Sequence, residues 1–202
     1  AIGGNAKIGG VSGTIKVETT GVANTISAAA GIAGGAVAVN AGIALAISRT
    51  KIHTYVGRGV TVNVPGSVVV YTGFTSNCAA MILSIAGGAV AVGATAAIAI
   101  NNTQAYTYIG ITPSGDVAQG SSLTGGKVTA SGVQVASTLA GNTYVAGVGI
   151  AGGAVAVNAT VALGFNRVKN ITAINGAGIE TTGNIELSGG LSGNTTVVTT
   201  SI

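Results

Sequence analysis

Few residues of this 202-residue chain carry side chains that could perform covalent or proton-transfer chemistry. It contains one cysteine, Cys78, and one histidine, His53, and no motif brings them together. A catalytic thiol needs a base within hydrogen-bond reach, and a zinc site needs three or four His, Cys or acidic ligands. The sequence therefore predicts neither a cysteine nucleophile nor a His/Cys metal site. Because Cys78 precedes an apolar segment, we expect a buried, inert thiol.

The acidic residues are too few and too scattered for an active site. They are Glu18, Asp116, Glu180 and Glu186. Repeat alignment makes Glu18 and Glu186 equivalent positions in different repeats, which argues against a paired acid and base. The single Asp excludes Asp-rich calcium loops. Residues 120–128 approach a phosphate-binding loop, but Val128 stands where a hydroxyl is required. The sequence predicts no enzyme and no cofactor.

Tyrosines form the one candidate contact site. Tyr55 lies in Thr-Tyr-Val, and Tyr106 and Tyr108 lie in a similar strand sequence, Tyr-Thr-Tyr-Ile. An aromatic strip of this kind suits contact with carbohydrate or protein. Aromatic pairs between strands also stabilise a sheet without binding anything. The sequence favours this structural role and leaves the surface-contact role open.

The charge pattern argues against a nucleic-acid partner. Charged residues make up 6% of the chain, and eight Lys and Arg against four acids give a net charge of +4. The basic residues stand singly rather than in runs. Tracking a phosphate backbone requires a dense basic face. We expect solvated, isolated charges instead.

Internal repeats dominate the chain. Ala-Gly-Gly-Ala-Val-Ala-Val occurs at 33–39, 86–92 and 151–157. Flanking similarity gives three repeat cores, 24–75, 77–140 and 142–192, in a single array over 1–202 that starts and ends within a repeat. Residues 5–9 align with the Tyr-Ile-Gly position of later repeats. The second interval is longer, and its additional residues fall in 111–126, which predicts a surface loop.

Periodicity decides between helix and strand. Segments 26–48, 81–100 and 145–165 are uncharged, and by length and hydropathy each could be a transmembrane helix. An integral membrane protein with three helices is therefore the alternative. However, large side chains recur at every second residue, as in Val37, Val39 and Ile43, and this is the period of a strand. β-Branched residues and Gly/Asn turns around them favour strands as well.

These patterns predict an all-β fold, a β-solenoid (β-helix) of about three imperfect repeats with no significant helix. A sandwich of the same strands is the other all-β possibility. We expect the Val/Ile/Leu side of each strand to point inward and the Ala/Gly/Asn side to point outward. The equivalent residues Asn40, Gly93 and Asn158 are expected to bend the long strands.

The Gly-Gly-Ala-Val-Ala-Val-Asn-Ala run, the Tyr-Ile-Gly position and the Gly-x-Val-x-Val strand resemble repeats of large bacterial filamentous haemagglutinin-like surface adhesins. These exoproteins are exported by autotransporter or two-partner routes. The resemblance implies an extracellular, cell-surface, structural segment: an adhesin stalk or filament subunit. Its partners would be further copies, joined end to end or laterally, and a host-surface protein or glycan, with no membrane insertion. A polysaccharide-active solenoid would need clustered acids or cations, which this sequence lacks.

Overall fold

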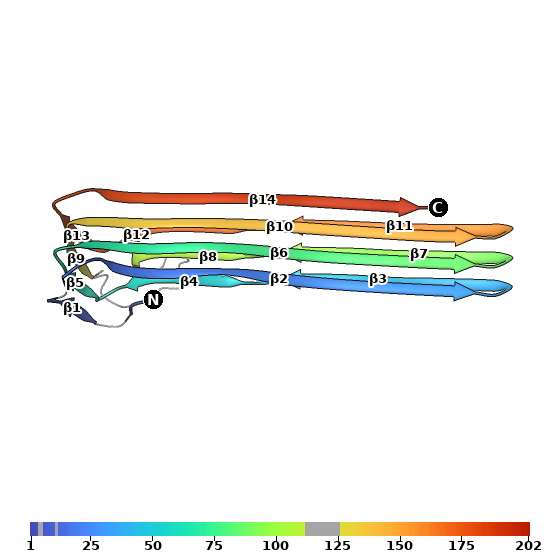
Figure 1. Ribbon diagram of the computed structural model, residues 1–202, viewed down its shortest axis with the longest axis horizontal. Helices are drawn as coiled ribbons and strands as arrows, with labels where there is room; N and C mark the ends of the chain where they lie inside the picture. The colour runs from blue at the N-terminus through green and yellow to red at the C-terminus, as the bar shows by residue number, and fades with distance from the viewer. Residues whose placement is uncertain (4–5, 11, 112–125) are drawn as a thin grey trace.

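The computed structural model describes residues 1–3, 6–10, 12–111 and 126–202, and in these residues it contains strands and turns and no helix (Figure 1). The strands are β1 (Lys7–Gly9), β2 (Ile15–Gly34), β3 (Val37–Ser48), β4 (Lys51–Gly57), β5 (Thr61–Asn63), β6 (Ser67–Gly87), β7 (Val90–Asn101), β8 (Gln104–Gly110), β9 (Lys127–Ala130), β10 (Gly132–Gly152), β11 (Val155–Asn166), β12 (Lys169–Asn175), β13 (Gly178–Thr181) and β14 (Ile185–Ser201). The all-β prediction is confirmed.

The chain follows the same path repeatedly. It runs out along β2, turns, returns along β3 and β4, and crosses through β5 to the start of β6. We call such a path a circuit; β6–β9 and β10–β13 form the next two, and β14 begins another. Each strand pairs in parallel with its counterparts, which gives the sheets β2-β6-β10-β14, β3-β7-β11, β4-β8-β12 and β1-β5-β9-β13.

The strand register pairs most of the residues that the sequence repeats make equivalent. Two of the predicted equivalences are corrected by the structure. Asn24, Asn77 and Asn142 are partners, as aligned. However, Lys7–Gly9 pairs with Thr61–Asn63, so residues 5–9 do not lie at the Tyr-Ile-Gly position. Ile2 occupies that position instead, since its N–H donates to the Tyr55 carbonyl at 2.8 Å. Two Ile-Gly pairs near the N-terminus, Ile2-Gly3 and Ile8-Gly9, fit the same pattern, and the sequence alignment used the second where the structure uses the first.

The second correction concerns the predicted equivalence of two acidic residues, Glu18 and Glu186. Glu18 pairs with Tyr71, and Glu186 pairs with Gln134, two residues before Ala136, the partner of Tyr71. Glu18 and Glu186 are therefore not equivalent, and the sequence alignment was wrong by one step of the two-residue period.

The repeated Gly-Gly pair forms the tight turn between the outgoing and returning strands. Gly35 has a φ of 139°, in the region that disfavours a side chain. A Cβ on Gly88 would collide with the carbonyl oxygen of Gly35, and one on Gly153 with that of Gly88. Backbone bonds join these turns, with Gly88 N–H donating to the Gly152 carbonyl at 3.0 Å. Stacking of turns therefore requires the second glycine of each pair.

Circuits contain two different cores. At the end where β5 and β9 cross, valines fill a conventional core that includes Val60, Val62, Val68, Val70 and Val135, all fully buried. We call this end the head. We call the other part the blade. In the blade, the last halves of β2, β6 and β10 face β3, β7 and β11. Its interior is built mainly of small side chains such as Ala44, Ala80, Ala97 and Ala99.

In the blade, the predicted direction of the side chains is wrong. Ala38 and Ala44 are 2% and 1% exposed, whereas Val37 and Ile43 are 68% and 73% exposed. The physical reason is the two-residue turn, which holds the two sheets so close that mainly small residues fit between them; a larger one such as Ile82 lies against a glycine, Gly42. A Cβ on Gly31, for example, would lie 2.5 Å from Oδ1 of Asn40 on the facing strand.

The predicted bends are also wrong, and the alternative with three helices is not found. Asn40, Gly93 and Asn158 lie within unbroken strands, and the returning path breaks later, as at Arg49–Thr50. Segments 26–48, 81–100 and 145–165 are strands and turns, which contradicts the three-helix alternative. Among the described residues, no helix is long and apolar enough to cross a membrane. Most of the predicted loop at 111–126, with Asp116, lies outside the described residues, as do residues 120–125 of the segment that approaches a phosphate-binding loop.

Candidate functional site

Among the described residues, Cys78 has backbone carbonyls as its hydrogen-bond partners. It points into the blade, 1% exposed, and its thiol donates to the carbonyls of Ala46 and Ile100, both at 3.5 Å. Burial raises the pKa of the thiol. A protonated, shielded sulfur is a poor nucleophile, so the geometry supports the predicted inert thiol.

Charged groups form isolated surface pairs. Lys16 Nζ lies 2.7 Å from Glu18, and Lys127 Nζ lies 2.8 Å from Glu180, whose pKa is lowered by this partner. Both pairs are exposed, where ion pairs contribute little to stability. Within the described ranges, no three His, Cys, Asp or Glu side chains gather as a metal site would require.

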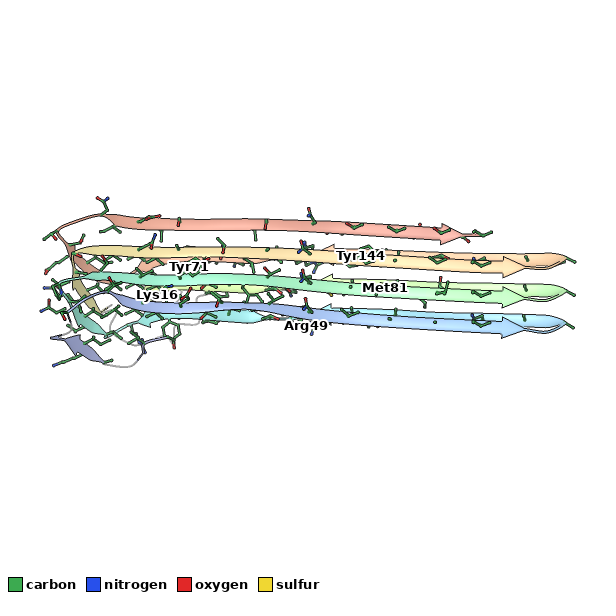
Figure 2. The ribbon with its side chains drawn as sticks, viewed as in Figure 1. Lys16, Arg49, Tyr71, Met81 and Tyr144 are labelled. Carbon is green, nitrogen blue, oxygen red and sulfur yellow. The ribbon has the colours of Figure 1, made fainter. Side chains whose placement is uncertain are left out.

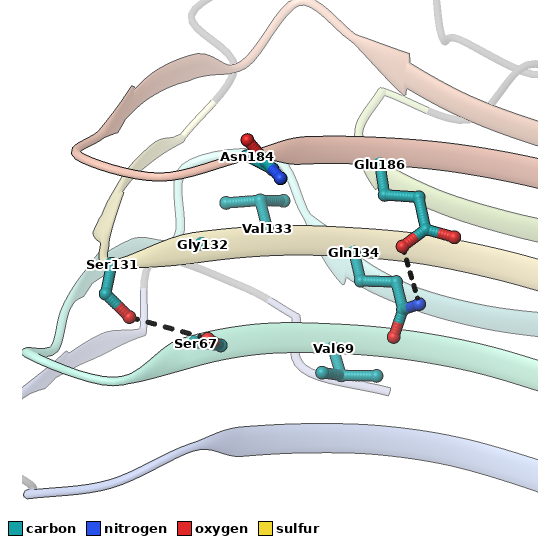
Figure 3. Close-up of a pocket in the computed structure, with 8 residues that line it drawn as sticks. All are labelled: Ser67, Val69, Ser131, Gly132, Val133, Gln134, Asn184 and Glu186. Carbon is teal, nitrogen blue, oxygen red and sulfur yellow. Dashed lines mark hydrogen bonds between the residues drawn. The ribbon is translucent and has the colours of Figure 1, made fainter.

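A shallow hollow on the head, over the starts of β6 and β10, is lined largely by polar side chains (Figure 3). Gln134 Nε2 donates to Glu186 at 3.0 Å, and the Ser67 and Ser131 hydroxyls lie 3.4 Å apart. These polar groups bond one another along the stacking direction. They therefore serve the contact between circuits and leave few groups directed at a ligand.

The predicted tyrosine strip exists as a stack. Tyr55 and Tyr108 stack with ring centroids 5.1 Å apart, and Tyr106 stacks on His53 at 4.8 Å. Lys169 lies 6.0 Å from the Tyr106 ring centroid. Tyr106 and Tyr108 are only 5% and 6% exposed. Most of the aromatic area therefore contacts neighbouring circuits, which favours the structural role; contact with an outside partner stays a prediction.

An asparagine ladder crosses the outer side of the long sheet. Asn77 Nδ2 donates to Asn24 Oδ1 at 2.8 Å, and Asn142 Nδ2 donates to Asn77 Oδ1 at 2.9 Å. Each amide bonds the equivalent amide of the previous circuit. The ladder ties successive circuits together and marks the border of the blade, since the outward residues beyond it are mostly apolar.

Outward side chains of β3, β7 and β11 form what we call the apolar face. All of its members are apolar: Val37, Val39, Ala41, Ile43, Leu45, Ile47, Val90, Val92, Ala94, Ala96, Ile98, Ile100, Val155, Val157, Ala159, Val161, Leu163 and Phe165. Val37, Ile43 and Val157 are 68%, 73% and 57% exposed. Soluble surfaces rarely present so continuous an apolar patch unless something binds it.

Charge stops where the apolar face begins. Residues 19–48, 72–101 and 137–166 contain no Lys, Arg, Asp, Glu or His. The returning strands are followed at once by Arg49 and Lys51 in the first circuit and by Arg167 and Lys169 in the third. Figure 2 shows Arg49 at the junction between β3 and β4. The arrangement separates a charged head from an uncharged blade.

Comparisons of the chain with protein-family models, curated proteins and solved structures find no match. The similarity to filamentous adhesins therefore rests on the quoted sequence motifs alone.

Sequence reasoning missed the apolar face because it assigned those side chains to the interior. The sequence does contain a sign of which side of each strand points inward. It is found in pairs of residues that lie at equal distances before and after the turn. Gly31 faces Asn40, and Gly149 faces Asn158, so each larger residue has a glycine opposite. Such compensation is expected only of side chains that share one confined space.

Proposed function

We propose that this chain is a structural, non-enzymatic β-solenoid segment that acts as an adhesin stalk or as a filament-forming subunit. The observation that carries the proposal is the pairing of every long strand with its counterpart in the next circuit, in parallel and in register. Such pairing makes each circuit a template for the next. Stiffness along the stacking direction follows, because bending would break many hydrogen bonds at once.

Like residues stacked on like residues add to this axial stiffness. The asparagine ladder, the aromatic stack of Tyr55 on Tyr108 and the fully buried Val62 and Val128 in paired strands repeat one contact from circuit to circuit. Identical ladders of this kind stabilise parallel, in-register sheets. The same geometry lets a further circuit, or a further copy, continue the stack.

The remaining parts of the proposal follow from the sequence resemblance. They are a location outside the cell, on its surface, association of copies end to end or laterally, and contact with a host-surface protein or glycan. The tyrosine strip is the candidate for the last contact, although the small exposed area of Tyr106 and Tyr108 makes it a limited one.

Axial association can be tested at the free side of β14. Val133 N–H donates to the Asn184 carbonyl, and Ile202 N–H donates to the Gly149 carbonyl. Because alternate residues of a strand bond to opposite sides, the N–H of Thr199 points away from β10. Thr199→Pro therefore removes one donor from the free side and keeps the pairing with β10. Thr199→Val, which keeps the N–H, is the matched control.

Electron microscopy and sedimentation of the purified chain give the readout. We expect rods whose length grows with concentration in the wild type and the Val variant, and shorter rods in the Pro variant. Circular dichroism should show a β spectrum without helical bands. Compact single particles at all concentrations, or the same rod length in all three proteins, would contradict the filament proposal.

A further inference from the structure

The apolar face is the strongest unassigned feature of the molecule, and its size is close to that of a protein interface. Each of its strands has 12 residues. At about 3.3 Å per residue and about 4.8 Å between strands, three strands present roughly 570 Å². Two such faces in contact would bury roughly 1,100 Å² in total, which exceeds the ~1,000 Å² expected of a specific interface.

The flatness of the blade indicates a sheet as the partner. Figure 1 shows the strands of the blade nearly straight and side by side, with their directions aligned in this view. Flat sheets are uncommon, and they occur mainly where side-chain ladders or stacked sheets stabilise them. Twisted partners could touch a flat face only locally, whereas a second flat face can contact it along its whole length.

The pattern of side-chain sizes on the face is complementary to itself. A row of small residues, Ala41, Ala94 and Ala159, lies beside a row formed by Ile43, Ala96 and Val161, which is larger in the first and third circuits. These two rows occupy the middle of the strands. If a second copy meets the first with its strands reversed and its circuits in the same order, Ala41 and Ala159 of each copy lie opposite Ile43 and Val161 of the other, and the two small residues of the second circuit lie opposite each other.

Charge selects the same orientation. Arg49 and Lys51, and likewise Arg167 and Lys169, follow the face at one end only. With the strands of the two copies reversed, the two groups of cations lie at opposite ends of the interface. With the strands in the same direction the cations would meet, and like charges in contact oppose association.

We infer that the apolar face packs against the same face of a second copy, about a two-fold axis parallel to the stacking direction. The strands of the two blades run in opposite directions, and their circuits stack in the same order. This inference rests on the proposed structural function and specifies its lateral association. Two solenoids joined this way form a double-width rod with a charged head along each margin.

A lipid surface is the competing occupant for an apolar face. The area of the face and the placement of the cations, argued above, favour a second copy over lipid. The two occupants make different predictions for the other side of the blade, where Leu83 is 40% exposed. A bilayer would cover both sides, whereas a second copy covers only the apolar face.

Matched variants of the middle circuit test the inference. Val92 on the apolar face is 37% exposed, close to the 40% of Leu83 on the opposite side. Val92→Lys places two unpaired ammonium groups in the proposed interface, and Leu83→Lys places them outside it. By sedimentation equilibrium of the whole chain, we expect Val92→Lys to raise the dissociation constant for lateral pairs at least tenfold and Leu83→Lys to change it less than threefold.

The orientation of the pair has its own readout. Ala89 is exposed in the turn at the end of the blade. Nitroxide labels on Ala89→Cys should lie about 40 Å apart or more across the proposed pair, since the 12-residue strands run in opposite directions. Labels within about 20 Å, which a same-direction pair requires, would overturn the orientation. Native Cys78 is buried and is a minor target for the label.

Outcomes for the two proposals are distinguishable. Equal effects of Val92→Lys and Leu83→Lys, or none from Val92→Lys, would overturn the lateral inference. So would flotation of the wild type with phosphatidylcholine vesicles that is lost in both Lys variants, because a membrane would then be the occupant. Pairs that depend on Val92 but never lengthen into rods would keep this inference and remove the filament proposal.

Discussion

The closeness of the two blade sheets gives the most direct test of the fold. Gly31 of β2 faces Asn40 of β3, whose Nδ2 donates to the Ile85 carbonyl at 3.3 Å. A Cβ on Gly31 would lie 2.5 Å from Oδ1 and 2.9 Å from Nδ2 of Asn40. The second circuit has the opposite solution, with Ser84 facing Gly93. Exchanging the first solution for the second therefore tests whether the facing residues share one space.

The expected magnitudes follow from these contacts. Gly31→Ser overpacks the blade, which should lower the free energy of unfolding by about 1–3 kcal/mol. It also displaces the side-chain amide of Asn40, whose hydrogen bond to the Ile85 carbonyl is worth about 1 kcal/mol. Asn40→Gly loses that bond and adds roughly 0.5–1 kcal/mol for a glycine within a strand. In the double variant the clash is absent. We therefore expect the double variant to lose about 2 kcal/mol less free energy of unfolding than the sum of the losses of the two single variants.

Urea denaturation followed by circular dichroism measures these differences, with a common slope for all variants. Ala30→Ser, on the exposed side of the same strand, is the control and should change the free energy of unfolding by less than about 0.5 kcal/mol. If Gly31→Ser is as harmless as the control, or if the double variant loses the full sum, the facing of Gly31 and Asn40 is refuted.

Further predictions concern the turns and the titratable groups. Gly88→Ala, which drives a Cβ into the backbone of the preceding turn, should lower the free energy of unfolding by about 2 kcal/mol or more, whereas Gly87→Ala, with nothing within 4 Å, should cost less than about 1 kcal/mol in the same urea experiment. Cys78 should react with a thiol reagent many times more slowly in the folded than in the urea-unfolded chain, because burial raises its pKa and blocks access; equal rates would contradict its placement. Glu180 has a folded-state pKa below its ordinary value, so its contribution to stability is present above the unfolded pKa and is lost as the pH falls through the folded one. Carboxyl titration by NMR should show this pKa returning toward its ordinary value in Lys127→Ala, and an unchanged value would exclude the ion pair.

Strand type could be predicted because it depends on local periodicity. The alternation of Val37 and Ala38 specifies a strand whatever surrounds it, and the repeated Gly-Gly pair specifies where the chain turns. Register followed from aligning distinctive residues, such as Asn77 with Asn142. It failed near Ile2, where the sequence offers two similar Ile-Gly pairs and the choice depends on backbone bonds to Tyr55.

The direction of the side chains could not be read from periodicity alone, because a period of two defines two sides of a strand and does not say which is inside. The usual rule, that large apolar residues are buried, holds in the head, where Val68 and Val70 are fully buried. It fails in the blade, where the tight turn, rather than hydrophobicity, decides what fits. Only by comparing residues across the turn, such as Gly31 with Asn40, does the confined interior become visible.

That reversal has a functional consequence. A blade with Val37 and Ile43 inside would have been a self-sufficient core with a small, weakly adhesive surface. With Ala38 and Ala44 inside, the two sheets lie in close contact, and large apolar side chains such as Val37 and Ile43 are left outside. Hydrophobic burial scales with area, so much of the stabilisation available to this sequence is realised only when the apolar face is covered. If the apolar face packs against a second copy, as inferred above, covering it should raise the stability of the blade as well as join the copies.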